Sequence, residues 1–184
     1  MRRKVLTLAG LGFGVCLIAS AVAEENRIGA GAEYDAITGD AGDAWGGYVT
    51  YTRDLNSVLS LQLTANYLLG DYEFQIETPP KPPLSGDYTT VGFEVALLGR
   101  YETDEFVPYC GFGAGYYFND YDELTVNDKL GMMFLAGFYV PLSDTLSLDL
   151  SARYRYLRPD TYEIFLPEVS MDGWVLRAGV SLQF

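Results

Sequence analysis

Seven charged side chains at alternating positions are the residues best placed to do chemistry. The positions of Asp149, Arg153 and Arg155 differ by even numbers, so these side chains share one face of an extended chain. Acids and arginines gathered in this way would suit a proton path, a gated pore or a catalytic carboxylate pair. We favour instead a network of ion pairs that fills the interior of the folded protein, because buried charges persist only when they are paired. The set expected on this face is Glu33, Glu94, Arg100, Asp149, Arg153, Arg155 and Arg177.

Several other kinds of site are argued against by composition. The chain contains no histidine, which excludes Ser-His-Asp triads and imidazole acid–base or metal chemistry. A net charge of −13 argues against nucleic-acid binding, which needs basic patches. The segment Gly111–Gly115 lacks the third glycine of a dinucleotide loop, and Asp120 and Asp122 lack the glycine and glutamate that complete a calcium loop. We expect no enzyme activity and no cofactor; loose binding of divalent cations by the acidic loops stays open.

The first 23 residues have the pattern of an export signal. Basic residues at positions 2–4 precede an apolar stretch over residues 5–20, and Ala21-Val22-Ala23 forms a small-residue cleavage site before Glu24. The alternative is an uncleaved anchor, but residues 5–23 would barely span a bilayer. We therefore predict a signal peptide over residues 1–23 and one mature domain over residues 24–184. Cys110 is then the only cysteine left, so no intramolecular disulfide is expected.

Period-two alternation of apolar and polar residues dominates the rest of the chain and predicts β-strands. In the segment 58–69, leucines alternate with Ser60, Gln62, Thr64 and Asn66. The segment 145–157 repeats the pattern with Asp149, Arg153 and Arg155 on its polar face. The predicted strands are residues 26–36, 44–53, 58–69, 88–101, 107–118, 129–141, 145–157 and 171–184. Short connections at 54–57, 102–106 and 142–144 alternate with longer ones at 37–43, 70–87, 119–128 and 158–170.

Alternation alone also fits a soluble β-sandwich, whose apolar face points inward. Three features favour a membrane barrel whose apolar face points outward. Aromatic residues gather on the apolar face near both predicted strand ends, as at two lipid–water interfaces. Many glycines share the charged face, which indicates a crowded interior. The third feature is the export signal. The expected outer belt is Tyr34, Trp45, Tyr67, Tyr116, Tyr154, Tyr156 and Trp174, and the inner belt is Tyr51, Tyr101, Phe138 and Phe184.

Three segments resemble the small outer-membrane barrels of the OmpA/OmpX type. Residues 108–118 (PYCGFGAGYYF) are similar to their fifth strand and residues 147–156 to their seventh. Phe184, with Leu182 and Val180 at alternate positions, resembles the terminal strand that marks such proteins for barrel assembly. The resemblance implies an all-β, eight-stranded antiparallel transmembrane barrel in the Gram-negative outer membrane. The partners that it implies are membrane lipids, lipopolysaccharide and the barrel-assembly machinery.

The function predicted from this reading lies in the loops, because binding residues concentrate there. We expect a non-enzymatic envelope protein that presents loops for adhesion to a host, phage or cell-surface ligand, as the resemblance implies. The alternative is a narrow channel for small solutes or ions. The candidate loop contacts are Phe74, Ile76, Leu84, Ile164, Phe165 and Leu166. These residues would instead pack against each other if the strands that flank the loops project beyond the bilayer.

Overall fold

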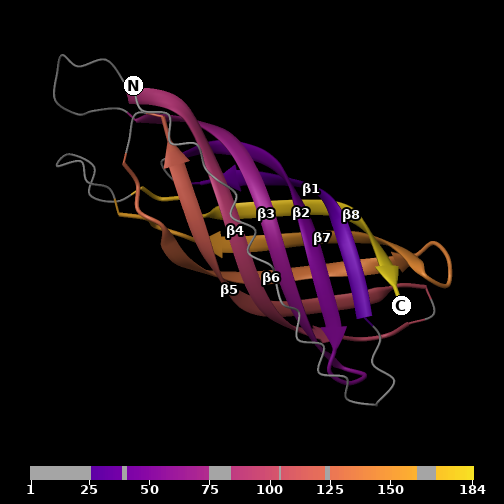
Figure 1. Ribbon diagram of the computed structural model, residues 1–184. Helices are drawn as coiled ribbons and strands as arrows, with labels where there is room; N and C mark the ends of the chain where they lie inside the picture. The colour runs from indigo at the N-terminus through magenta and orange to yellow at the C-terminus, as the bar shows by residue number, and fades with distance from the viewer. Residues whose placement is uncertain (1–25, 39–40, 75–83, 104, 123–124, 161–168) are drawn as a thin grey trace, which may run out of the picture.

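The protein is a closed barrel of eight antiparallel strands in which each strand pairs with the next and β8 pairs with β1 (Figure 1). This computed structural model describes residues 26–38, 41–74, 84–103, 105–122, 125–160 and 169–184. The predicted all-β barrel is thereby confirmed. The strands are β1 (Asn26–Ile37), β2 (Ala41–Asp54), β3 (Leu59–Phe74), β4 (Leu84–Arg100), β5 (Val107–Tyr121), β6 (Lys129–Pro141), β7 (Leu146–Tyr156) and β8 (Gly173–Gln183).

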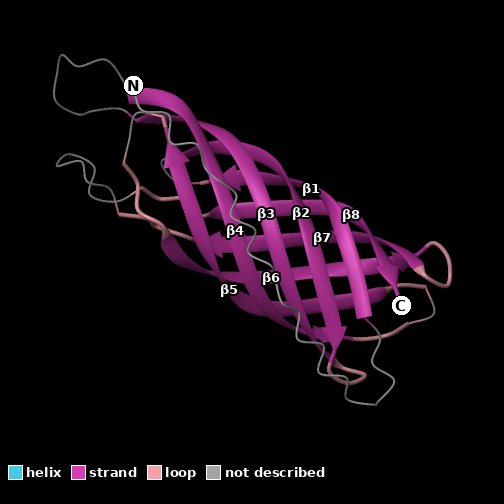
Figure 2. Cartoon of the chain, in the orientation of Figure 1, coloured by secondary structure: helices cyan, strands magenta, loops and turns pink. Residues whose placement is uncertain are grey.

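Strand is the regular secondary structure throughout the described ranges (Figure 2). Within the same ranges, no helix is long and apolar enough to cross a membrane.

The two faces of each strand follow the predicted alternation with the polar face inside. On β3, Gln62, Thr64 and Asn66 are at most 5% exposed, whereas Tyr67 and Leu69 are about half exposed. Successive side chains of a strand point to opposite faces, so a barrel that buries its polar residues must present the apolar ones outward. This arrangement suits a lipid surrounding and reverses the usual order of a soluble protein.

Aromatic side chains form belts on the outer face near both ends of the strands. Towards one end, Tyr34 packs on Trp45 with ring centroids 4.4 Å apart, and Tyr154 packs on Trp174 at 5.4 Å. At the other end Tyr101 and Phe184 are about 70% exposed. These belts match the positions at which a barrel meets the two membrane interfaces.

Closure between the first and last strands leaves no strand edge exposed. β1 and β8 pair from Arg27 opposite Gln183 to Ile37 opposite Gly173. Asn26 and Phe184 exchange backbone hydrogen bonds of 3.1 and 2.9 Å at the end of this seam. In lipid each unpaired backbone group would cost several kcal/mol, so this closure is a condition for residing in a membrane.

The predicted limits of several strands were too short at one end of the barrel. β3 and β4 continue to pair as far as Phe74 opposite Leu84, so the connection shrinks from the predicted 70–87 to 75–83. The loop predicted at 37–43 is reduced to residues 38–40, and β5 continues to Tyr121. The outward residues here include Asp71, Glu73 and Asp87 rather than apolar side chains. Apolar alternation therefore stops where the strands rise beyond the membrane, although their backbone pairing continues.

The connections define an inner and an outer end of the barrel. Three short ones, at 55–58, 101–106 and 142–145, lie at the end where β8 finishes; the orange β6–β7 turn marks this end in Figure 1. At the opposite end β1 and β2 are separated by residues 38–40 alone, but the strand pairs β3–β4, β5–β6 and β7–β8 are separated by the longer stretches 75–83, 122–128 and 157–172. Because short turns of outer-membrane barrels face the periplasm, we name these the inner and outer ends, respectively.

Candidate functional site

The central part of the barrel interior holds two acids and two arginines that bind one another across the lumen. We call Glu33, Glu94, Arg153 and Arg177 the central charge cluster; each is at most 4% exposed. Arg153 Nη1 donates to Glu94 Oε2 at 2.7 Å, and Arg177 Nη2 donates to the same carboxylate at 3.2 and 3.3 Å. Arg177 Nε also donates to Glu33 Oε2. Four strands, β1, β4, β7 and β8, are therefore tied together through Glu94 and Arg177.

The β-barrel register explains one half of this cluster directly. Glu33 lies opposite Arg177 in the β1–β8 pair, so their inward side chains are neighbours on the same wall. Glu94 and Arg153 come from β4 and β7, which do not pair with each other, so their ion pair crosses the lumen. An eight-stranded barrel is narrow enough for side chains from opposite walls to meet.

Neutral side chains complete the hydrogen bonds of the central charge cluster. Tyr117 donates its hydroxyl proton to Glu94 Oε1 at 3.0 Å, and Asn66 Nδ2 lies 3.4 Å from the same oxygen. Arg153 Nη2 donates to Gln62 Oε1 at 3.2 Å, and the Arg177 guanidinium stands 4.8 Å from the ring centroid of Tyr48. Buried charges need such partners because burial without them costs several kcal/mol per ion.

Two further ion pairs lie towards the two ends of the cluster. Towards the outer end, Arg155 pairs with Asp35 and stands 5.2 Å above the Tyr117 ring. Towards the inner end, Arg100 pairs with Asp54, whose other carboxylate oxygen accepts a 2.7 Å bond from Ser60. The seven charges expected in the interior are all at most 8% exposed.

Asp149 has a different neighbour from those expected by pairing acids with arginines. It accepts a 2.7 Å hydrogen bond from the hydroxyl of Tyr109. Tyr109 packs against Tyr139 at 4.8 Å, and both belong to an apolar patch on the inner wall of β4, β5 and β6. The interior is therefore part polar or charged and part apolar, whereas the sequence analysis expected polar, charged and small residues there.

Sequence reasoning missed Arg27, Asp35 and Asp54, which are also buried in the interior. Arg27 and Asp35 occupy the same alternate positions of β1 as Glu33, so the spacing alone identifies them. Asp54 was placed in a turn, but it is the last residue of β2 and pairs with Ser60 of β3.

An apolar layer closes the outer end of the lumen. We call it the outer plug, and it comprises Leu68, Tyr72, Tyr88, Tyr121, Leu157, Val169 and Met171, which pack with Ala41, Ala44, Tyr117 and Val126. Tyr88 stacks on Tyr121 with ring centroids 5.0 Å apart, and each of the seven side chains is at most 5% exposed. Val169 and Met171 reach the plug from the long connection between β7 and β8.

The side chain of Asp172 holds the returning segment of this connection in place. Its carboxylate accepts 2.8 Å hydrogen bonds from the Leu157 amide and from Arg158 Nε. Its carbonyl accepts a 2.8 Å bond from the Thr38 amide, which joins the segment to the β1–β2 connection. Sequence alternation carried no signal for this contact because it joins the ends of loops.

The predicted loop contacts are only partly within the described residues. Phe74 and Leu84 are paired strand residues at the ends of β3 and β4, as expected if these strands project beyond the bilayer. β7 already ends at Tyr156 and β8 begins only at Gly173, so these two strands do not project in this way. Ile76, Ile164, Phe165 and Leu166 lie outside the described residues.

Among the described residues, no group of three or more acidic or cysteine side chains is arranged to hold a metal ion.

The chain matches a known protein family over nearly all of its length. The family described as outer membrane protein beta-barrel domain matches residues 7–184. No match was found among the curated proteins.

Solved structures of outer-membrane proteins share the fold at low sequence identity. OprG from Pseudomonas aeruginosa is 14% identical, covers 87% of this chain and 95% of its own, and has a TM-score of 0.74. A major outer membrane protein from Thermus thermophilus is 18% identical, with a TM-score of 0.63, and the match covers 89% of this chain and 100% of that protein's chain. Ail of Yersinia pestis, in complex with the heparin analogue sucrose octasulfate, is 14% identical, covers 88% and 99%, and has a TM-score of 0.58.

Both the inverted faces of the strands and the family match agree with the resemblance seen in the sequence. The chain therefore belongs to the outer membrane protein beta-barrel domain family and is an eight-stranded barrel of the Gram-negative outer membrane.

Proposed function

We propose that this barrel is a non-enzymatic envelope protein with a filled interior, which stabilises the outer membrane and makes surface contacts through its outer loops. The observation that carries this proposal is the ion pair across the lumen between Arg153 and Glu94. Together with the outer plug, it places two layers of buried side chains in the path of a solute. Binding is then expected at the outer surface and in the connections between strands there.

The charge of the outer end narrows the class of surface ligand. The described outward residues there include the acids Asp43, Asp71, Glu73, Asp87 and Asp120, all exposed. Ail, a barrel of the same fold, was crystallised with a sulfated heparin analogue. A polyanion of that kind would be repelled by the acidic surface of this chain. We therefore propose a neutral or cationic surface ligand for adhesion, and contact with lipopolysaccharide phosphates through bridging divalent cations.

A narrow channel for small solutes or ions is the second candidate. It is supported by a pocket that opens the lumen from the inner end, between the β6–β7 turn and the start of β1. The central charge cluster and the outer plug would then act as barriers that must move before a solute passes.

Conductance of the purified barrel in planar bilayers separates these two candidates. We expect the protein to shift in electrophoretic mobility on boiling in SDS, as a closed barrel does, and to give no steady ion conductance. A folded barrel with a reproducible conductance would contradict the filled interior and favour the channel. Conductance is compared only for preparations that show this shift, so the heat shift serves as the control for folding in each conductance measurement.

We also propose how the chain reaches the membrane. Residues 1–23 are a signal peptide removed before Glu24, and N-terminal sequencing of the protein from outer membranes tests this cleavage. Val180, Leu182 and Phe184 point outward in one row and are about half exposed or more, which leaves them accessible as the signal for the assembly machinery. A chain without Phe184 should then yield less heat-modifiable barrel in the membrane.

A further inference from the structure

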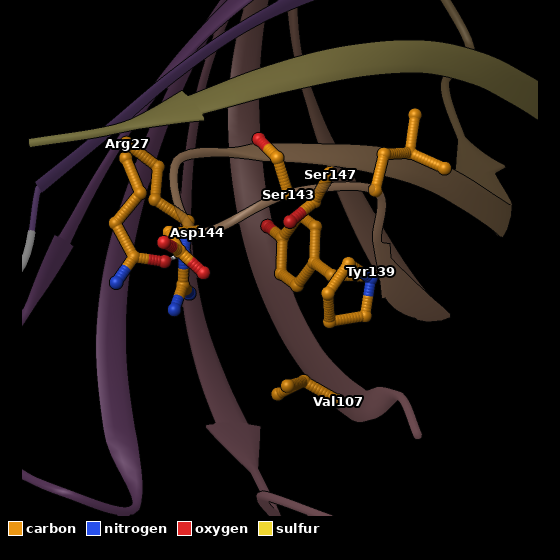
Figure 3. A pocket seen from close by; sticks show the side chains of 9 residues that line it. Arg27, Val107, Tyr139, Ser143, Asp144 and Ser147 are labelled. Atoms are coloured by element: carbon orange, nitrogen blue, oxygen red, sulfur yellow. Dashed lines mark hydrogen bonds between the residues drawn. The ribbon is translucent and has the colours of Figure 1, made fainter. Parts of the chain in front are cut away.

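A pocket at the inner end of the barrel has the size of a small-molecule site. It lies between the β6–β7 turn, the first residues of β1 and β5, and the last residues of β8, and its volume is about 410 Å³ (Figure 3). Pockets that enclose small ligands have volumes of roughly 300–1,000 Å³. The central charge cluster lies deeper in the lumen, so the pocket is a vestibule entered from the periplasmic side.

The pocket contains one charge of each sign at different depths. Arg27 is 6% exposed. Its Nε donates a 3.2 Å bond to Gln183, its Nη2 forms a 3.8 Å ion pair with Asp54, and its guanidinium stands 5.1 Å from the Tyr139 ring centroid. Asp144, on the β6–β7 turn, is exposed at the rim. A guanidinium fits a carboxylate in two-pronged geometry, and a carboxylate attracts an ammonium group. A ligand with both charges therefore complements this pocket better than a simple anion or cation.

Two hydroxyl groups, those of Ser143 and Ser147, also line the pocket. Ser143 Oγ accepts bonds from the amides of Thr145 and Leu146 at 3.4 and 3.1 Å, and its own proton can still be donated. Ser147 also lines the pocket and pairs with Ser181 of β8. The Ser181 hydroxyl is buried and has no hydrogen-bond partner among the described residues.

The opposite wall of the pocket is apolar. Figure 3 shows Val107 across the space from Arg27 and Asp144, whereas the Tyr139 ring stands 5.1 Å from the Arg27 guanidinium. Leu142 of the β6–β7 turn adds to the apolar lining. An apolar side chain of a ligand would be removed from water there, which favours binding in proportion to the area covered.

We propose that this pocket binds an α-amino carboxylate, either as a free amino acid or as the end of a short peptide. The carboxylate lies against Arg27, the ammonium group against Asp144, and the side chain against Val107 and Leu142. A barrel with a filled centre holds such a ligand without conducting it, so this inference does not depend on the choice between a structural protein and a channel.

Isothermal titration of the folded full-length barrel in detergent micelles tests the proposal with four probes. L-leucine carries both charges and an apolar side chain, and D-alanyl-D-alanine carries both charges farther apart at the ends of a short peptide. Leucinamide lacks the carboxylate, and N-acetyl-leucine lacks the ammonium group. We expect L-leucine, the dipeptide or both to bind, and the two blocked compounds to bind roughly tenfold more weakly or worse, since each loses a charge-assisted hydrogen bond.

The pattern of binding distinguishes the two sources of ligand. Binding of L-leucine alone assigns the site to free amino acids, and binding of the dipeptide assigns it to peptide ends. Absence of binding by both at millimolar concentration overturns the proposal, as does equal binding of leucinamide and L-leucine.

Two variants and a matched control place the ligand in the pocket. Asp144→Asn changes an exposed turn residue and should weaken binding of L-leucine about tenfold while N-acetyl-leucine is unaffected. Arg27→Lys keeps the charge but loses the two-pronged geometry, so it should also weaken binding. Asp122→Asn removes an exposed acid at the outer end and should leave binding unchanged. Unchanged binding in Asp144→Asn and Arg27→Lys, with the heat shift of the barrel intact, overturns the placement.

Discussion

Replacing Arg153 with glutamate is expected to remove most of the folded, heat-modifiable barrel. The new carboxylate would stand beside Glu94, where Arg153 now donates a 2.7 Å hydrogen bond in a site only a few per cent exposed. Breaking a buried ion pair in this way costs about 3–5 kcal/mol. That is a large fraction of the roughly 5–15 kcal/mol by which domains are usually stable. The free energy of unfolding, measured by urea titration in lipid vesicles, checks the expected loss.

A graded series separates loss of the pair from repulsion. Arg153→Met removes the positive charge but leaves Glu94 bound to Arg177 at 3.2 Å, so it should cost less than Arg153→Glu. Lys129→Glu breaks the exposed pair with Asp160 and should change stability by no more than about 1 kcal/mol. An Arg153→Glu protein that is as stable as the wild type, but whose bilayers conduct with altered ion selectivity, would reject the filled interior and establish the channel.

The sequence predicts the structure best where the alternation of apolar and polar residues assigns every side chain of a strand to the inner or the outer face. Alternation assigned Gln62, Thr64 and Asn66 to the interior and Tyr67 to the outer face. It could do so because one side of each strand in a membrane barrel faces the lumen and the other faces lipid. The same rule works only inside the membrane. At Asp71 and Glu73 the outward side chains become polar, so the pattern no longer marks a strand that the backbone pairing continues.

Contacts across the lumen lay beyond what the sequence predicts. The approach of Glu33 to Arg177 follows from pairing the first strand with the last. The approach of Glu94 to Arg153 depends on strand tilt and stagger, which decide the heights at which opposite walls meet. The outer plug is a stronger example, because Val169 reaches it from the predicted connection 158–170, which has no periodic pattern.

The sequence analysis also failed to place two tyrosines, Tyr109 and Tyr117, in the interior, for a related reason. Tyr109 and Tyr117 occupy the same alternate positions of β5 as Gly111, Gly113 and Gly115, which marks them as inward residues. The sequence reading associated aromatic residues with the lipid face and did not apply the alternation to these two. In the structure the glycines make room for the rings: a Cβ on Gly115 would stand 2.9 Å from the Tyr117 hydroxyl. Large and small residues on the inner wall are therefore complementary, as packing in a narrow barrel requires.

Gly179→Val is expected to destabilise the barrel by about 2–3 kcal/mol, which is near the upper end for overpacked sites. Gly179 faces inward on β8, where a Cβ would stand 2.9 Å from the Cα of Gly31 and would also strike the backbone oxygen of Ala30. Backbone atoms of a paired strand cannot move aside without breaking the β1–β8 seam. The same Cβ meets the hydroxyl of Tyr48, whose ring lies under the Arg177 guanidinium, so the substitution also disturbs the central charge cluster.

The preceding residue supplies the matched control for this substitution. Ala178 is exposed on the lipid face of the same strand, so Ala178→Val adds the same kind of side chain outside the barrel. Its effect on the free energy of unfolding should stay within about 0.5 kcal/mol, as for other surface changes. Urea titration of both variants in lipid vesicles makes the comparison. If Ala178→Val were the destabilising change and Gly179→Val the neutral one, the apolar face would be the packed interior, and the assignment of inside and outside would have to be reversed.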